Sequence, residues 1–169
     1  MSADAWQEGA AGEMGVRRGF PLRYNGSMPN RTADAVWSGS LMEGSGHLKS
    51  ATGAIDADYN WKSRAESGTT TNPEELIAAA HAGCFNMALA HALATAGHAP
   101  RQLRTRASVT FEKVGEGFGI TGIRLETSGD VPGMDEAAFR KAAEGAKSGC
   151  PVSKALASVP ITLEAKLGK

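Results

Sequence analysis

One stretch of the chain, residues 71–85, carries the start signals of a helix and constrains everything around it. Asn72 is suited to cap the first turn, Pro73 suits the first helical position, and the two acidic residues that follow favour the positive end of the helix dipole. We predict a helix from Pro73 to about Ala96, ended by Gly97. Alanine is its most frequent residue, so other elements can pack closely against it, and we expect a core helix rather than a membrane span.

The chain has two cysteines, and each falls in a setting that alters thiol chemistry. Cys84 lies inside the predicted helix, where a buried thiol by itself behaves as a small apolar side chain. Cys150 precedes Pro151, which predicts that it sits at the N-cap of a short helix running to about Ala157. The positive end of such a helix stabilises a thiolate. From these residues alone, two buried structural thiols are the default interpretation and a redox pair is the alternative.

The sequence around both cysteines resembles the OsmC/Ohr family of thiol peroxidases, and its OsmC branch in particular. The resemblance rests on the blocks Thr71–Phe85 and Lys147–Ser153, with Val131-Pro132-Gly133 between them, and the motif order agrees from about Ala35 to Leu167. It implies an α+β, OsmC-like fold, in which antiparallel sheets pack on a long central helix. It also implies an intertwined homodimer.

The resemblance further implies roles for individual residues. Cys84 corresponds to the peroxidatic cysteine and Cys150 to the resolving cysteine. Arg64 matches the arginine of the family's active site, and Glu74 matches the acid that holds its guanidinium. A thiol in an apolar wall has a raised pKa, so Cys84 needs such a cation to be a thiolate at neutral pH. Without the family, Arg64 would be interpreted as a surface residue paired with Glu66.

The spacing of Glu74 and Cys84 supports an independent inference about the assembly. The two positions are ten apart (84 − 74), which is about 15 Å along a straight helix that rises about 1.5 Å per residue. Either the helix is broken between them, or Arg64 and Glu74 reach Cys84 from another chain. We favour the second alternative, which predicts an obligate dimer with two composite sites.

The reaction that the resemblance implies is a two-cysteine peroxidase cycle. The Cys84 thiolate attacks a hydroperoxide, becomes a sulfenic acid and condenses with Cys150 to an intrachain disulfide. The family implies organic hydroperoxides as substrates, hydrogen peroxide as a weaker one, and a lipoylated protein or dihydrolipoamide as the reducing dithiol. No cofactor is expected. Two alternatives are a noncatalytic binding or scaffold protein on the same fold, and a Cys-His hydrolase or transferase.

Composition limits the class and the partners of the protein. A length of 169 residues suits one domain. The 18 basic and 18 acidic residues balance, which disfavours nucleic acid or an anionic membrane as a partner. Two cysteines suit a reducing compartment, and Met1 to Ser27 lacks the apolar run of an export signal, so we expect a cytoplasmic protein.

Other polar residues receive structural interpretations. The basic group Arg101, Arg104 and Arg106 is expected on a solvated strand face rather than in a nucleic-acid patch. Three histidines, His81, His91 and His98, lack the carboxylate or cysteine partners of a metal site, so we expect packing or surface roles and no metal.

The remaining pattern predicts a flexible N-terminal arm, residues 1–30, followed by a single domain, residues 31–169. An alternative is that the arm wraps a partner subunit. Before the central helix, extended segments are predicted over Ala35–Met42, Gly46–Ser50 and Ala57–Ala65. After it, we predict strands Leu103–Lys113 and Phe118–Ser128 with a bulge near Gly122, a helix from Asp135 to about Lys147, and a last strand from Ile161 to Leu167.

Overall fold

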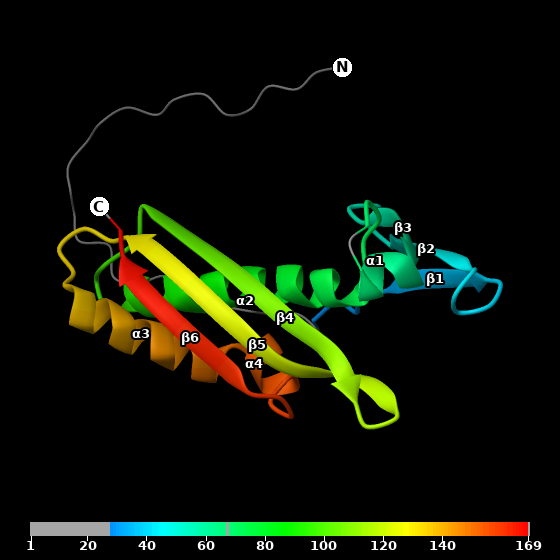
Figure 1. Ribbon diagram of the computed structural model, residues 1–169. Coiled ribbons are helices and arrows are strands. Elements are labelled where there is room, and N and C mark those ends of the chain that lie inside the picture. The colour runs from blue at the N-terminus through cyan, green and yellow to red at the C-terminus, as the bar shows by residue number, and fades with distance from the viewer. Residues whose placement is uncertain (1–27, 67, 169) are drawn as a thin grey trace, which may run out of the picture.

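The structure is a computed structural model that describes residues 28–66 and 68–168. All but the last three residues of the predicted arm, residues 1–30, lie outside the described residues. In chain order the elements are β1 (Ala33–Ser38), β2 (Ser45–Ser50), β3 (Asp56–Asn60), α1 (Trp61–Ala65), α2 (Pro73–Thr95), β4 (Gln102–Val114), β5 (Gly117–Asp130), α3 (Glu136–Gly149), α4 (Pro151–Ala155) and β6 (Ile161–Leu167). They form an α+β arrangement of two three-stranded sheets, one along the long helix α2 and one beyond its N-terminal end (Figure 1).

Helix α2 is the long central helix of the structure, and it confirms the prediction made from the sequence. It runs for 23 residues without a break, and the Asn72 side chain caps its first turn. Gly97, with φ of 87°, follows its end in the left-handed conformation that favours glycine. By length and composition alone α2 could cross a membrane. One of its faces nevertheless packs in the core, since Phe85, Leu89 and Leu93 are fully buried.

The sheet β4-β5-β6 lies along one side of α2. Strands β4 and β5 pair in an antiparallel hairpin, whose register shifts between Thr110 and Phe111. Gly122 pairs with Thr110 and Ile120 with Phe111, so the extra residue Thr121 forms the bulge that the sequence predicted nearby. β5 and β6 pair in parallel, so the expectation of antiparallel sheets is wrong at this edge. Helices α3 and α4 between these strands return the chain to run in the same direction as β5.

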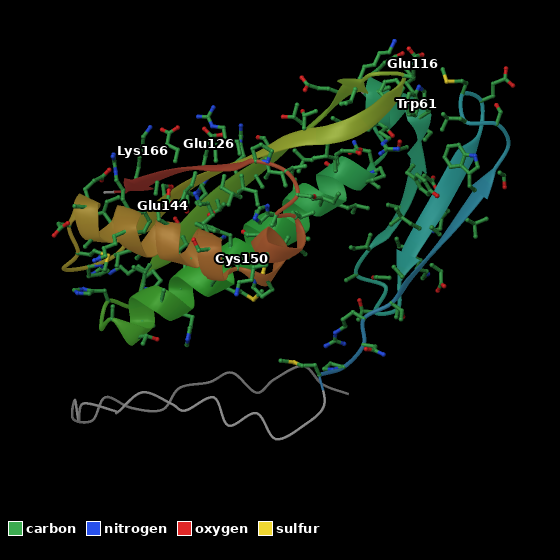
Figure 2. The ribbon with its side chains drawn as sticks, turned by 90° about the horizontal axis from the view of Figure 1, so that it is seen from below. Trp61, Glu116, Glu126, Glu144, Cys150 and Lys166 are labelled. Carbon is green, nitrogen blue, oxygen red and sulfur yellow. The ribbon has the colours of Figure 1, made fainter. Side chains whose placement is uncertain are left out.

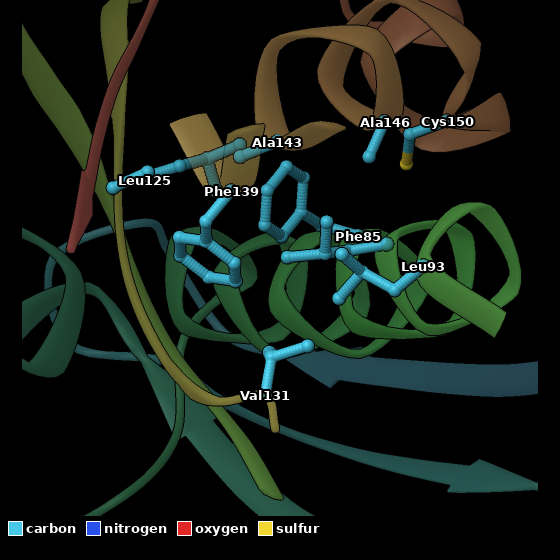
Figure 3. Close-up of a cluster of buried hydrophobic side chains, with 10 residues drawn as sticks. Phe85, Leu93, Leu125, Val131, Phe139, Ala143, Ala146 and Cys150 are labelled. Carbon is cyan, nitrogen blue, oxygen red and sulfur yellow. The ribbon is translucent and has the colours of Figure 1, made fainter. Parts of the chain in front are cut away.

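The hydrophobic core lies between this sheet, α2 and α3 (Figure 3). Phe85 of α2, Leu125 of β5 and Phe139 of α3 are fully buried in it. Gly129 of β5 leaves room for the ring of Phe139, because a Cβ at Gly129 would lie 2.7 Å from a ring carbon. Burying one such ring contributes about 2–3 kcal/mol. The packing of this core sets the orientation of α3 and places its C-terminal end beside α2.

The antiparallel sheet β1-β2-β3 extends beyond the N-terminal end of α2, apart from this core (Figures 1 and 2). Val36 in β1 and Leu41 and Met42 in the following turn are 66%, 56% and 70% exposed. A three-stranded sheet ordinarily needs a helix or another sheet against its apolar face to be stable. In a single chain, little packs against the apolar residues of this sheet.

A short helix replaces the end of the third predicted strand. The strand was expected to reach Ala65, but β3 ends at Asn60 and α1 follows. The Asn60 side chain accepts a hydrogen bond from the Ser63 amide at 2.8 Å, and the Ser63 hydroxyl completes a capping box. This local capping outweighs the strand preference of the aromatic residues. Arg64 therefore lies on a helix and not at the end of a strand.

Candidate active site

The structure brings the two cysteines together. The Cys84 and Cys150 sulfur atoms are 3.2 Å apart, although both thiols are free. Cys84 lies in the middle of α2, and Cys150 lies between α3 and α4 (Figure 2). Cys150 is fully buried, whereas Cys84 is partly exposed. Cys84 is therefore the more accessible of the two cysteines.

Cys150 is held in place by two helix ends. Its backbone amide donates to the carbonyl of Ala146 at 2.8 Å in α3, and its carbonyl accepts from the amide of Lys154 at 3.0 Å in α4. Its φ of −61° and ψ of 123° are the extended conformation expected before a proline. The short helix predicted from Pro151 is confirmed, and it ends at Ala155 rather than near residue 157.

The two thiols differ in their electrostatic surroundings. Burial is the largest cause that raises the pKa of Cys84; Cys150 raises it further, and the amide of Val152 opposes the change. Burial acts on Cys150 as well, but the Ser153 amide, the Cys84 thiol and the Ser153 hydroxyl together lower the pKa of Cys150 below its ordinary value. Within one chain, the thiolate is therefore favoured at Cys150. This agrees with the prediction from its N-cap position.

Arg64 and Glu74 form a tight ion pair. Arg64 Nε donates to both carboxylate oxygens at 3.1 and 3.2 Å, and Nη2 donates to Oε1 at 2.8 Å. Glu74 is only 7% exposed, and the guanidinium carbon lies 4.3 Å from the centre of the Phe111 ring. Arg64 thus pairs with Glu74, as predicted, and not with Glu66. Such a forked, stacked guanidinium is fixed in position.

Within one chain this ion pair is remote from the cysteines. Helix α2 is continuous from Pro73 to Thr95, so Glu74 and Cys84 are separated by about 15 Å along its axis. The alternative of a broken helix is therefore wrong. In residues 28–66 and 68–168, no cation is among the groups that shift the pKa of Cys84.

An aromatic cavity of about 270 Å³ opens beside Arg64. Its lining is Trp37, Leu41, Tyr59, Asn60, Trp61, Arg64 and Pro73. The Trp61 ring also packs edge-on against Phe111 and Phe118, with centroid distances of 6.4 and 5.2 Å. A cation therefore stands beside an apolar pocket. The sequence did not reveal this pocket, because Trp61 and Arg64 were both expected on one strand, where residues three apart point to opposite faces.

Of His81, His91 and His98, only His81 makes a contact near the cysteines in the part of the chain that the structure describes. His81 is fully buried, and its Nε2 lies 2.8 Å from Ser153 Oγ in α4. His98 is within 3.3 Å of the Pro132 carbonyl, and His91 is exposed. Over the described ranges, no three His, Cys, Asp or Glu side chains gather as metal ligands do. The sequence predicted a packing or surface role for His81 and did not single out Ser153.

Known proteins share the sequence pattern and the fold of this chain. The family described as OsmC-like protein matches residues 66–164. Peroxiredoxin OsmC of Escherichia coli strain K12 is 41% identical over 139 residues, which cover 82% of this chain and 96% of that protein. The crystal structure of the organic hydroperoxide resistance protein OhrB of Bacillus subtilis aligns with a TM-score of 0.64 at 30% identity, covering 80% of this chain and 98% of that one.

A further crystal structure supports the fold alone. It is an organic hydroperoxide resistance protein from Elizabethkingia anophelis, which aligns with a TM-score of 0.67 at 24% identity and covers 84% of this chain and 100% of that one. The described α+β arrangement is thus shared with solved members of this group of proteins.

Proposed function

The chain belongs to the OsmC family of thiol peroxidases, and we propose that it reduces organic hydroperoxides with Cys84 as the peroxidatic and Cys150 as the resolving cysteine. The observation that carries this proposal is the 3.2 Å separation of one partly exposed and one buried sulfur. A substrate can approach the first sulfur, and the second is already close enough to form a disulfide with it.

The proposed cycle has three steps. The Cys84 thiolate attacks the distal oxygen of the hydroperoxide, the O–O bond breaks, and the leaving alkoxide takes a proton from solvent to become an alcohol. The Cys150 thiolate then attacks the sulfur of the Cys84 sulfenic acid, the S–O bond breaks, and the leaving hydroxide takes a proton from solvent to become water. A dithiol of the lipoyl type reopens the disulfide by exchange and becomes a disulfide itself. The cycle needs a reducing compartment, which favours the cytoplasm.

The enzyme is an intertwined homodimer in this proposal, with Arg64 and Glu74 of one chain serving Cys84 of the other. The continuous helix α2 and the raised pKa of Cys84 support it, because a buried thiol needs a nearby cation to ionise. The face of α2 that carries Gly83 and Met87 is exposed in a single chain, and Met87 is 70% exposed. A second copy of α2 would cover this apolar face.

The first sheet supports the same assembly. Val36 in β1 and Ile55, directly before β3, are 66% and 42% exposed in a single chain. The element that carries the arginine is attached to this sheet, since α1 follows β3 directly. If a second chain covers the sheet, that chain also comes close to Arg64.

The aromatic cavity favours a substrate with a carbon skeleton. A volume of about 270 Å³ lined mostly by apolar side chains suits the organic part of a hydroperoxide, while Arg64 faces the peroxide oxygens. Hydrogen peroxide has no apolar part and gains nothing from these walls. It is therefore expected to react more slowly.

A peroxidase assay with two serine variants tests the proposal. The reduced protein is mixed with cumene hydroperoxide and dihydrolipoamide, and peroxide consumption is followed. We expect turnover in the unmodified protein, loss of turnover in Cys84→Ser, and loss of the intrachain disulfide in Cys150→Ser. If the unmodified protein consumes peroxide no faster than Cys84→Ser does, the result would favour a noncatalytic protein. Unchanged peroxide turnover in Cys150→Ser would contradict the resolving role of Cys150.

A further inference from the structure

Phe111 lies against Arg64, but the proposed cycle gives its ring no part. The guanidinium carbon of Arg64 is 4.3 Å from the centre of the Phe111 ring. A guanidinium at this distance over a ring is attracted by the negative charge of the π system. Arg64 lies on α1 and Phe111 on β4, so the contact joins two elements that are distant in the sequence.

The ion pair with Glu74 fixes only part of the orientation of the guanidinium. Its hydrogen bonds come from Nε and Nη2, which share one edge of the planar group. Such a fork sets the position of the group within its plane, but the plane can still tilt about the axis of the fork. A ring on one side of the plane opposes this tilt. The two contacts together fix the direction of Nη1, which takes no part in the fork.

A β-bulge brings a second ring against Phe111. The register of β5 shifts by one residue at Thr121, and beyond the shift Ile120 pairs with Phe111. Phe118, two residues before Ile120, therefore lies on the same side of the hairpin as Phe111 and is its diagonal neighbour. The two rings stack with their centroids 5.5 Å apart and an angle of 18° between their planes. Without the extra residue, Phe118 would lie on the opposite face.

Trp61 connects these two rings to the helix that carries Arg64. Its ring packs edge-on against Phe111 and Phe118, and it lies beside the tip of the β4-β5 hairpin, near Glu116 (Figure 2). Trp61 is the first residue of α1, and Arg64 lies three positions later, about one helical turn away. The hairpin thus contacts α1 both through Trp61 and through Arg64.

We propose that Phe111 is a positioning residue for the peroxidatic step: its ring holds the guanidinium of Arg64 so that Nη1 is directed at the Cys84 thiolate and the peroxide. This inference rests on the proposed function, in which Arg64 of one chain serves Cys84 of the other. The ring takes no part in bond making or breaking, and the reaction of the thiolate with the peroxide is the one given above. Loss of the ring leaves the charge of Arg64 in place but lets the group move, so the cation stabilises the thiolate less.

The first test follows peroxide consumption in the first turnover by stopped flow, as a function of pH. Phe111→Leu removes the ring but keeps an apolar side chain. We expect its rate to be about three- to fivefold below that of the parent at neutral pH, as the strength of a partly exposed cation–π contact indicates. The rate should approach the parent rate at alkaline pH, where Cys84 ionises without help. Phe111→Tyr keeps a ring and should keep the parent profile.

Phe118→Leu is the matched control for lost packing. It removes a ring from the same aromatic group, but not the ring that lies over Arg64. Its pH profile should therefore be that of the parent.

Two peroxides separate a positioning role from contact with the substrate. If Phe111 acts through Arg64, the fold loss in Phe111→Leu should be the same for cumene hydroperoxide and for hydrogen peroxide, since both react with the same thiolate. An aromatic wall for the organic group would affect cumene hydroperoxide alone. The double variant Arg64→Ala/Phe111→Leu should react at the rate of Arg64→Ala, because the ring then has no guanidinium to hold.

Nuclear magnetic resonance tests the position of the guanidinium without peroxide. Arg64 Nε–H donates to Glu74, and the guanidinium lies over the Phe111 ring, whose ring current shifts the Nε–H signal upfield. The signal is assigned by its absence in Arg64→Ala. We expect it to move downfield in Phe111→Leu and to move less in Phe118→Leu.

Four results would overturn the inference. They are an unmoved Arg64 signal in Phe111→Leu, a rate loss confined to cumene hydroperoxide, equal rate losses in Phe111→Leu and Phe118→Leu, and a further loss when Phe111→Leu is added to Arg64→Ala. The resonance measurement does not depend on peroxidase activity. A parent protein that shows no turnover, but the expected movement of the Arg64 signal in Phe111→Leu, would count against the proposed function alone.

Discussion

The sulfur atoms of Cys84 and Cys150 lie 3.2 Å apart although 66 positions separate the residues in the sequence. A disulfide bond is about 2.05 Å long, so a shift of about 1 Å joins them. Their backbones lie in the middle of one helix and at the junction of two others, and each is fixed by helical hydrogen bonds. The fold thus holds the two sulfur atoms close to bonding distance.

This proximity predicts that oxidation changes the structure very little. One equivalent of cumene hydroperoxide should form the intrachain disulfide while the far-ultraviolet circular dichroism spectrum stays the same, because only a small movement is needed. Mass spectrometry should show the loss of two hydrogens per chain. A marked loss of helical signal on oxidation would contradict the arrangement of α2, α3 and α4 described above.

Arg64 should control the pH dependence of the reaction. Burial raises the pKa of Cys84, so without the guanidinium the thiolate forms only at more alkaline pH. The rate of peroxide reaction in Arg64→Ala should therefore be at least about tenfold lower at neutral pH and recover as the pH rises. Stopped-flow measurements between neutral and alkaline pH would show the shift. Arg106→Ala, at an exposed position of β4, should keep the parent profile.

The exposed face of α2 should be sensitive to charge. A Cβ added at Gly83 would meet no atom within 4 Å in a single chain, so Gly83→Glu leaves the isolated fold intact but places a carboxylate on the proposed dimer contact. Gly145 is an equally open, exposed helical glycine on α3 and provides the matched variant Gly145→Glu. Sedimentation should report monomers for the first and dimers for the second. Dimers of equal stability in both would place the interface elsewhere.

Two glycines of β5 should respond differently to a methyl group. A Cβ at Gly129 would lie 2.7 Å from the Phe139 ring, whereas the nearest atom to one at Gly122 is 3.8 Å away. Gly129→Ala should lower the free energy of unfolding by about 1–3 kcal/mol, as overpacked cores do. Gly122→Ala should change it by less than about 1 kcal/mol. Urea unfolding of the pair measures the difference, and equal stabilities would contradict the packing of Phe139.

Local signals in the sequence predicted the elements of the main body. Asn72 and Gly97 set the bounds of α2, and the alternation of apolar residues located β4, β5 and β6. The first strand was expected to reach Met42, but the chain turns at Gly39, where φ is 92°. Helix α1 was missed because its signal, a capping box between Asn60 and the serine three residues later, lies inside a pattern typical of a strand.

Relations between distant segments were harder to predict. The direction of β6 depends on how α3 and α4 cross the sheet, which no local pattern reports. The contact of His81 with Ser153 spans 72 positions and joins two helices, so no spacing rule suggests it. Spacing was informative where a single straight helix carries both residues, as with Glu74 and Cys84. There the spacing led to the prediction that Arg64 and Glu74 reach Cys84 from a second chain.

Complementation between two inactive chains tests the central claim most directly. Arg64→Ala and Cys84→Ser chains are co-expressed with different tags, and the mixed dimer is purified by both. If Arg64 of one chain serves Cys84 of the other, one of the two sites has both groups intact, so the mixed dimer should show about half the parental turnover per dimer. If each Arg64 serves the cysteine of its own chain, both sites carry a lesion, and turnover no higher than that of the parent single variants would contradict the account.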